Sequence, residues 1–320
     1  MKSFIRCLVV HNEMEVDRSF LARGGWHLAI KGLVILGVGV ALVSLARQWG
    51  HIHVEFSHPW LLVPAVVFQA LSIIAAAVAW RHALWLITRR RLHGRLAVAH
   101  IGILLVTKYI PGKVWGYLGR GLALKDLGLA SGQIATATLM EQMAFFLSGG
   151  GAMVFAYCQT WWFWMALLAS MILLFACPWG SRGLARIALV IPGRWGRVVA
   201  GMGEGTAQLC SRNFLVLCGM SVWQWIFNSA VLVCIMVGVG VDLSASLLQA
   251  ALIAVPAAII LGILFILVPG GIGIREGVLV FYLEPVIGLE RAFMVSIVFR
   301  GLDTVRDVVL GTWSMNRLRR

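Results

Sequence analysis

The sequence has few charged residues, and few of these are acidic. Of its 320 residues 12% are charged, with 13 aspartates and glutamates against 27 lysines and arginines, while 60% are apolar. Soluble domains carry about 25% charged residues. The longest polar stretch runs only from about residue 178 to 213, which leaves no room for a soluble catalytic domain. We therefore expect a single membrane domain over residues 1–320.

Motifs for metal, nucleotide and disulfide chemistry are also missing. The six cysteines form no CxxC pair, no nucleotide-binding motif is present, and the acids form no DxxxD-like cluster for magnesium and diphosphate. The segment "HIHVEFSH" (residues 51–58) offers three histidines and a glutamate, but a short loop of this kind is more typical of a solvated turn than of a metal site. We expect no metal, no cofactor and no nucleic-acid partner.

Apolar runs of about 20 residues recur along the chain, each long enough to span a hydrocarbon core of roughly 30 Å. The mean hydropathy is +0.90. These runs predict an all-α polytopic integral membrane protein with about six full spans, at residues 28–46, 61–80, 133–157, 160–177, 214–240 and 291–312.

Lysine and arginine are concentrated in alternate connections, and this bias predicts the orientation. The leader (residues 1–27), the connection after the second span, the connector (residues 178–213) and the C-terminus are rich in these cations. The other connections are poor in them. The leader also lacks the apolar core of a signal peptide. Both termini are therefore expected on the cytoplasmic side of the cell inner (plasma) membrane.

Two further apolar stretches end in Pro-Gly, at Pro111-Gly112 and at Pro269-Gly270. Proline removes a backbone donor and glycine permits positive φ, so both helices should break there. From the charge bias, residues 96–128 should begin and end on the cytoplasmic side, and residues 247–286 should begin and end on the outside. We therefore predict two re-entrant hairpins that enter from opposite faces.

The hairpins belong to two similar segments, residues 96–157 and residues 247–312. Each has a broken hairpin, a Leu/Ile-Gly-Leu connector and a spanning helix with charges inside the membrane. The sequence "LGLASGQIATATLMEQ" is similar to "IGLERAFMVSIVFRGL" at an offset of 160. Opposed repeats whose broken helices meet near the midplane are typical of secondary transporters. We expect an inverted repeat.

A helix that restarts at such a break points its free N–H groups and positive dipole end into the membrane, where an anion such as phosphate can approach glycine closely. A packing break between close helices is the alternative, but charges accompany both breaks. We predict a binding site for a phosphate-bearing lipid, formed by Lys113, Arg120, Gly271, Gly273, Arg275 and Glu276.

Ionisable residues inside the predicted spans add to this site, because such residues are rare and face cavities or protein interiors. Glu141 lies in the first repeat, and Arg300 and Asp303 lie in the second, on one helical face with Asp307. Glu141 and Arg300 lie within one position of each other in the repeat alignment, so the sequence favours a contact between them, either functional or as a packing ion pair. Arg306 and Asp307 are nearer the cytoplasmic end and are expected at a solvated rim.

Three segments resemble the lysylphosphatidylglycerol synthase transmembrane, or flippase-like, family: "KYIPGKVWGYLGR", "VPGGIGIREG" and "VFRGLDTVRD". The resemblance extends over about residues 27–315. It implies a membrane protein that moves phospholipids or polyprenyl-phosphate-linked sugars between leaflets. The soluble synthase domain of some members is not part of the resemblance, so lipid aminoacylation is not implied. The family often has Glu-Arg in the first-repeat span, whereas this chain has Glu141-Gln142.

These observations favour a flippase over an enzyme, with an anionic lipid or a polyprenyl-phosphate lipid as substrate. Two alternatives remain open. One is a membrane enzyme that acts on lipid headgroups or polyprenyl phosphates, although the intramembrane acids are single and accompanied by arginine. The other is a non-transporting scaffold that partners glycosyltransferases in cell-envelope glycan biosynthesis.

Overall fold

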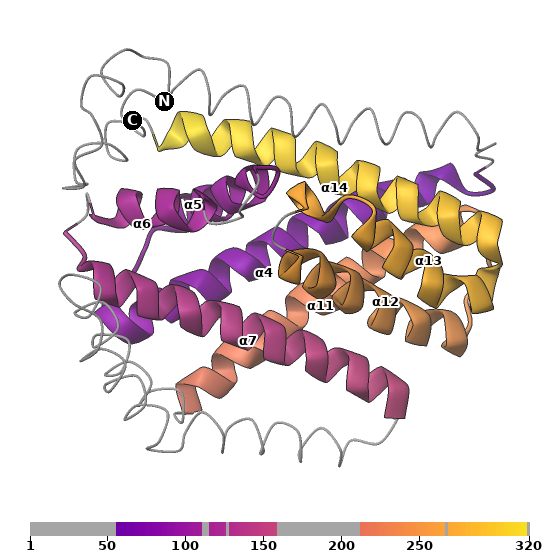
Figure 1. Cartoon of the computed structure of the whole chain (residues 1–320), viewed down its shortest axis with the longest axis horizontal. Helices are drawn as coiled ribbons and strands as arrows, with labels where there is room; N and C mark the ends of the chain where they lie inside the picture. The colour runs from indigo at the N-terminus through magenta and orange to yellow at the C-terminus, as the bar shows by residue number, and fades with distance from the viewer. Residues whose placement is uncertain (1–55, 111–114, 126–127, 159–211, 266–267, 319–320) are drawn as a thin grey trace.

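The computed structural model describes residues 56–110, 115–125, 128–158, 212–265 and 268–318, and every regular element in these ranges is a helix (Figure 1). The predicted leader, the predicted spans at 28–46 and 160–177 and most of the connector 178–213 lie outside the described residues. The predicted all-α fold class is confirmed for the described part of the chain.

Four of the described helices are long and apolar enough to cross a membrane. They are α4 (Leu62–Thr88), α7 (Ser131–Cys158), α11 (Arg212–Gly238) and α12 (Ala245–Leu264). The helices predicted at 61–80, 133–157 and 214–240 are therefore confirmed. α14 (Leu289–Arg317) is continuous, as predicted for 291–312. Because it contains several charged residues, it is not among the four apolar helices.

α4 and α11 form an antiparallel pair along their length. At one end the His58 N–H donates to the Gly238 carbonyl at 2.9 Å, and at the other His82 Nε2 lies 3.3 Å from the Asn213 carbonyl oxygen. α5 and α7 pack on α4, and α7, α12 and α14 pack on α11. The pair thus connects the two halves of the bundle.

Both predicted helix breaks are present. In the first repeat α5 (Gly94–Thr107) ends shortly before Pro111-Gly112, which lies outside the described residues, and α6 (Trp115–Lys125) follows. In the second repeat α12 is followed by the short 3-10 helix η3 (Pro269–Gly271) and then by α13 (Ile274–Ile287). The two breaks fall where the Pro-Gly pairs predict them.

Glycines allow the two arms of each hairpin to pack closely. A Cβ atom on Gly116 of α6 would overlap the Thr107 side chain of α5 and come within 3.0 Å of the Leu104 backbone. A Cβ atom on Gly262 of α12 would lie 2.7 Å from Arg275 Cγ on α13. Small residues at such contacts let helices approach in the absence of a hydrophobic driving force.

The two hairpins lie at opposite ends of the bundle and touch at their breaks. Figure 1 shows α5 and α6 at one end and α12 and α13 at the other. α12 begins beside the end of α7, since Gln249 Nε2 donates to the Ala156 carbonyl at 2.7 Å. Between the hairpins, the Gly270 N–H donates to the Lys108 carbonyl at 2.8 Å. The second break is therefore hydrogen-bonded to the end of the first hairpin's entering arm.

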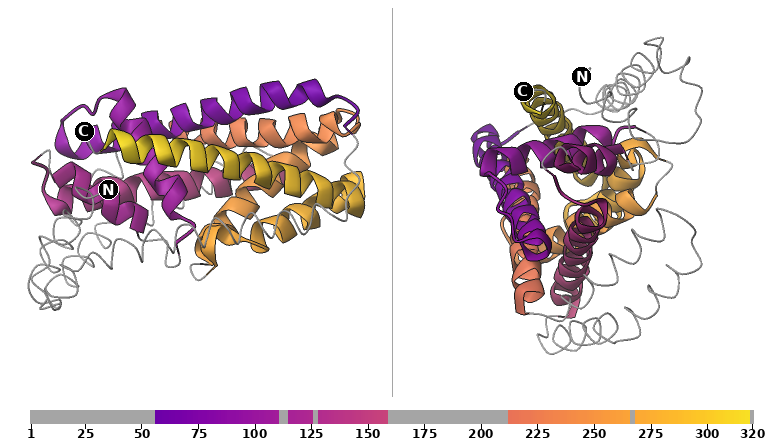
Figure 2. Two further views of the ribbon diagram at one scale, coloured as in Figure 1. Left: turned by 90° about the horizontal axis from the view of Figure 1, so that it is seen from above. Right: turned by 90° about the vertical axis from the view of Figure 1, so that its left-hand side faces the viewer.

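The helix contacts repeat with the partners exchanged. α6 packs on α7 as α13 packs on α14, and α5 packs on α14 as α12 packs on α7. α4 contacts α5 as α11 contacts α12. Figure 2 shows α4, α11 and α14 extending along the bundle, with each hairpin confined to one end. An inverted repeat predicts such an exchange of partners.

Candidate functional site

The candidate site lies where the second break meets α5 and α14. Three glycines at this break have positive φ: Gly270 (61°), Gly271 (69°) and Gly273 (81°). The Gly270 carbonyl accepts a hydrogen bond of 2.8 Å from Arg300 Nη2. A Cβ atom on Gly270 would come within 2.9 Å of both Arg300 and the Tyr109 ring. Only glycine meets both the backbone and the space requirement at this position.

Glu276 links the start of α13 to α14. One carboxylate oxygen, Oε2, accepts the Gly273 N–H at 2.7 Å, as the third residue of a capping box does. The other, Oε1, lies 3.2 Å from Arg300 Nε. Glu276 therefore caps α13 and holds Arg300 against the break, so the Gly273 N–H is already in use within the protein.

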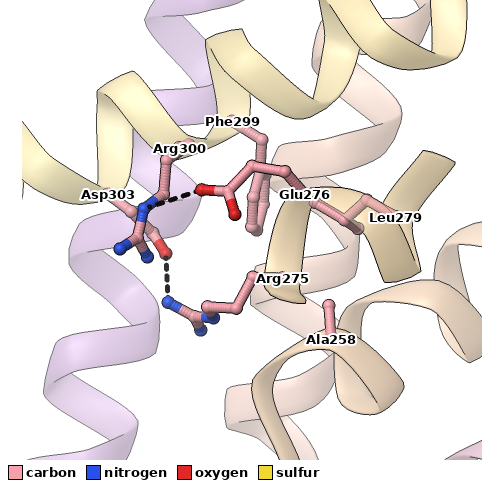
Figure 3. Close-up of a pocket in the computed structure, with 7 residues that line it drawn as sticks. All are labelled: Ala258, Arg275, Glu276, Leu279, Phe299, Arg300 and Asp303. Carbon is pink, nitrogen blue, oxygen red and sulfur yellow. Dashed lines mark hydrogen bonds and ion pairs between the residues drawn. The ribbon is translucent and has the colours of Figure 1, made fainter. Parts of the chain in front are cut away.

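Two aspartates of α14 form ion pairs with the other cations of the site. Asp303 pairs with Arg275 at 3.4 Å and with Arg306 at 2.9 Å. Asp307 pairs with Lys108 at 2.5 Å and with Arg306 at 2.9 Å. Figure 3 shows Arg275 reaching from α13 towards Asp303, beside the Glu276–Arg300 pair. The ion pairs thus connect both hairpins to α14.

Neutral side chains complete this network. Gln69 of α4 donates to Asp303 Oδ1 at 3.1 Å. The Tyr109 hydroxyl lies 3.0 Å from Asp307 Oδ2 and 3.3 Å from Thr304 Oγ1. Buried carboxylates need several such partners to offset the loss of water. Each of the three carboxylates, Glu276, Asp303 and Asp307, therefore has several hydrogen-bond or ion-pair partners.

On its basic side, the site carries a surplus of charge. Among the described residues, four cations face three carboxylates, namely Lys108, Arg275, Arg300 and Arg306 against Glu276, Asp303 and Asp307. Arg300 Nη1 is buried and has no hydrogen-bond partner among the residues that the structure describes. A buried donor without an acceptor is costly. One positive charge and at least one donor are available for an anion.

A small pocket opens beside these charges (Figure 3). Its lining residues are Ala258, Arg275, Glu276, Leu279, Phe299, Arg300 and Asp303. The space that a water-sized sphere can reach is about 10 Å³, near the minimum for one water molecule. A phosphate headgroup needs more room, so the helices must separate before such a group can enter.

Arg120 and Glu141 form a separate buried pair in the first repeat. Arg120 Nη2 donates to Glu141 Oε2 at 2.6 Å and to Thr138 Oγ1 at 3.2 Å. The guanidinium carbon lies 3.5 Å from the centre of the Trp80 ring, in a cation–π contact. Tyr117, also on α6, donates to Gln142 at 3.0 Å.

The expected contact between Glu141 and Arg300 is wrong. Glu141 pairs with Arg120 of α6, and Arg300 pairs with Glu276 of α13. Because the second arm of each hairpin packs on the long helix that follows it, Glu141 of α7 finds its partner on α6 and Arg300 of α14 finds its partner on α13. The two pairs join corresponding helices, α6 to α7 and α13 to α14, with the signs of the charges exchanged.

The predicted site residues therefore fall into two groups. Gly271, Gly273, Arg275, Glu276, Arg300 and Asp303 lie together at the second break, whereas Arg120 and Glu141 lie apart from them. Lys113 is outside the described residues, as are His51, His53 and Glu55. Within the part of the chain that the structure describes, no group of three metal-ligating side chains occurs.

Sequence analysis missed several members of the network. Asp307 was expected at a solvated rim but is fully buried. Gln69, Lys108 and Tyr109 were not singled out, and Arg306 was placed with Asp307 at the rim. The shared helical face of Arg300, Asp303 and Asp307 is the signal in the sequence that points to Asp307.

The chain matches the family model of the lysylphosphatidylglycerol synthase transmembrane region over residues 28–311. The chain belongs to this family. The match includes both broken hairpins and α14 up to residue 311, so all the described network residues are part of the family's domain. The lysylphosphatidylglycerol synthase transmembrane region is a membrane domain linked to lipid modification or translocation, and the chain is accordingly a membrane protein. A search of curated proteins finds no match.

Proposed function

We propose that this protein is a flippase that moves a phosphate-bearing lipid between membrane leaflets. The observation that carries the proposal is the junction of two broken hairpins, hydrogen-bonded through Gly270 and Lys108, beside a buried network with one surplus positive charge. Irregular backbone and charge inside a membrane are costly unless they serve a cavity or a substrate path. A phosphate group supplies the missing negative charge.

The proposal places the hairpins as re-entrant elements of an inverted repeat. Arginines gather at the end of the bundle that holds the α4–α5 connection and the end of α14, at Arg89, Arg90, Arg91, Arg95 and Arg317. The other end holds Asp242, Glu284 and Glu290. The positive-inside bias supports a cytoplasmic arginine-rich end, with both termini cytoplasmic and the protein in the cell inner membrane. The first hairpin then enters from the cytoplasm and the second from outside.

The substrate is a phospholipid or a polyprenyl-phosphate-linked sugar. Both carry a phosphodiester with a single negative charge, which matches the surplus charge of the network. The headgroup passes between the repeats while the acyl or prenyl chains remain in the bilayer. Arg275 and Arg300 bind the phosphate, and Glu276 and Asp303 hold these arginines in place.

Leaflet exchange in proteoliposomes tests this function. Purified protein is reconstituted with fluorescent phosphatidylglycerol or a fluorescent polyprenyl-phosphate sugar, and a membrane-impermeant quencher reports the exposed probe. Wild-type protein is expected to make the protected half of one probe accessible. Arg275→Ala should abolish this exchange, whereas Arg291→Ala, the same change at an exposed position of α14, should not. Exchange unaltered by Arg275→Ala would remove the anion site from the proposal.

The same preparation separates the other functions. Chemical change of a probe headgroup without exchange would favour a membrane enzyme, in keeping with the word synthase in the family description. Neither exchange nor chemical change, together with co-purification of a glycosyltransferase, would favour a scaffold.

A further inference from the structure

The two ion pairs of the repeats differ in how firmly they are held. In the second repeat, Glu276 also accepts the Gly273 N–H and Arg300 also donates to the Gly270 carbonyl, so the backbone fixes both partners. In the first repeat, no backbone hydrogen bond of this kind is found among the described residues, and Arg120 reaches Glu141 through Nη2 alone. The Arg120–Glu141 pair is the one that can exchange partners.

Arg120 also has donors to spare. Its side chain is fully buried, and its Nε and Nη1 atoms have no hydrogen-bond partner in the described part of the chain. Its guanidinium rests on the Trp80 ring, which supports it from one face. An arginine presents its donors as a planar fork that fits two oxygens of a phosphate. The edge of Arg120 formed by Nε and Nη1 has no such oxygen beside it among the described residues.

His100 on α5, which contacts Trp80 as Arg120 does, also has a buried nitrogen without a partner among the described residues. Its Nδ1 accepts the Trp80 indole N–H at 3.3 Å, which assigns the proton of the neutral ring to Nε2. Nε2 is buried and has no partner in the described structure. Arg120 and His100, from the two arms of the first hairpin, both contact Trp80 and together carry three buried nitrogen donors that have no acceptor among the described residues. Buried donors are normally satisfied, so the site is built for an acceptor that enters it.

We propose that the lipid phosphate, at a separate step from its binding by Arg275 and Arg300, displaces Glu141 from Arg120, and that Glu141 then takes up one proton. This inference rests on the proposed flippase function. When Arg120 pairs with the phosphodiester, Glu141 loses its counter-ion in a low-dielectric interior, where a carboxylate neutralises instead of remaining charged. The proton comes from water at the open face, and it is released when Arg120 returns to Glu141. One proton thus moves with each lipid anion.

Among the side chains that the structure describes, none near Glu141 is a second cation that could replace Arg120. α6 contributes Tyr117 beside Arg120, α5 contributes His100, and α11 contributes Cys218 to the same core cluster. Arg81 of α4 is engaged with the Leu92 carbonyl, nearer the end of the bundle, and His82 lies beside the Asn213 carbonyl. α12, which also packs on α7, has no ionisable residue.

Coupling of one proton to one phosphodiester makes the transport electroneutral. A pH gradient then drives net accumulation of the lipid in the less acidic leaflet, while a membrane potential has no effect. Glu141→Gln fixes the neutral form of the side chain. In that variant the lipid anion moves alone, so the response to the pH gradient is lost and a response to the potential appears.

The experiment imposes each gradient separately on proteoliposomes with the same two probes. In wild-type protein the ratio of probe between leaflets should follow the pH gradient, and in Glu141→Gln it should follow a potassium diffusion potential, each about tenfold per pH unit or per 59 mV. Glu284→Gln, the same change at an exposed acid, should behave as wild type.

Two results would overturn the coupling and leave the flippase in place. The first is wild-type exchange that equalises the leaflets under a pH gradient. The second is Glu141→Gln exchange that still follows the pH gradient. Absence of exchange of either probe by wild-type protein would overturn the flippase function, and the coupling with it.

Discussion

At the residue scale, Gly270 is the position on which the junction of the hairpins depends. It donates to the first hairpin, accepts from Arg300 and lies against Tyr109. Each of these contacts needs a backbone that approaches its neighbours without a side chain. The backbone of this break also holds two charged side chains. The Gly270 carbonyl binds Arg300, and the Gly273 N–H binds Glu276.

Gly270→Ala should lower the stability of the protein and abolish lipid exchange. The left-handed backbone alone costs a non-glycine residue about 1–2 kcal/mol, and the added methyl group overlaps Arg300 and Tyr109. Thermal unfolding in detergent measures the stability. Gly277→Ala is the matched control, because it lies in α13 with open space around it and alanine favours a helix. Equal unfolding temperatures for both variants would contradict this role.

Glu276→Gln separates the two roles of Glu276. Glutamine can still accept the Gly273 N–H, as in other capping boxes, but it leaves the buried Arg300 without a counter-ion. Loss of one partner of a buried pair costs about 3–5 kcal/mol. We expect a lower unfolding temperature, which the further change Arg300→Gln should partly restore. A double variant less stable than Glu276→Gln would show that the charge on Arg300 is balanced by other groups.

At the element scale, local sequence predicts the helices and their breaks well. Proline and glycine act on their own backbone, so the breaks after α5 and after α12 could be found without knowing any neighbour. The partners of Glu141 and Arg300 could not be found in this way, because they depend on which helices pack together. The position of Asp307 near the end of its helix predicts exposure, but α5 covers this part of α14 and buries its side chain.

The close contact between α5 and α14 depends on a glycine of each helix, Gly102 of α5 and Gly311 of α14. Gly311→Ala would place a methyl group into the Val106 side chain of α5. Overpacking of this kind costs about 1–3 kcal/mol, so both the unfolding temperature and the exchange rate should fall. Gly150→Ala in α7, where the space is open, is the control. A wild-type unfolding temperature for Gly311→Ala would mean that the two helices separate easily.

At the scale of the whole molecule, the reversed order of the two hairpins connects fold and function. Alone, each hairpin would leave backbone groups at its break and several charged side chains without the partners that they have in the bundle. Together they pair one break with the end of the other hairpin's entering arm, and α14 neutralises most of the charge through Asp303 and Asp307. In the proposed flippase, the small pocket at this junction corresponds to a closed state, from which opening towards either end would expose the same arginines to either leaflet.

This arrangement predicts that the connections of the two hairpins face opposite sides of the membrane. Single cysteines at Arg91→Cys and Glu290→Cys, in a chain whose native cysteines are replaced by serine or alanine, probe the two ends at exposed positions. A membrane-impermeant maleimide added to intact cells should label the cysteine at 290 and leave the one at 91 unlabelled until the membrane is permeabilised. The reverse pattern would invert the orientation derived from the arginines. Labelling of both cysteines in intact cells would place both hairpins on one side, and alternate exposure of a single site would then lose its structural basis.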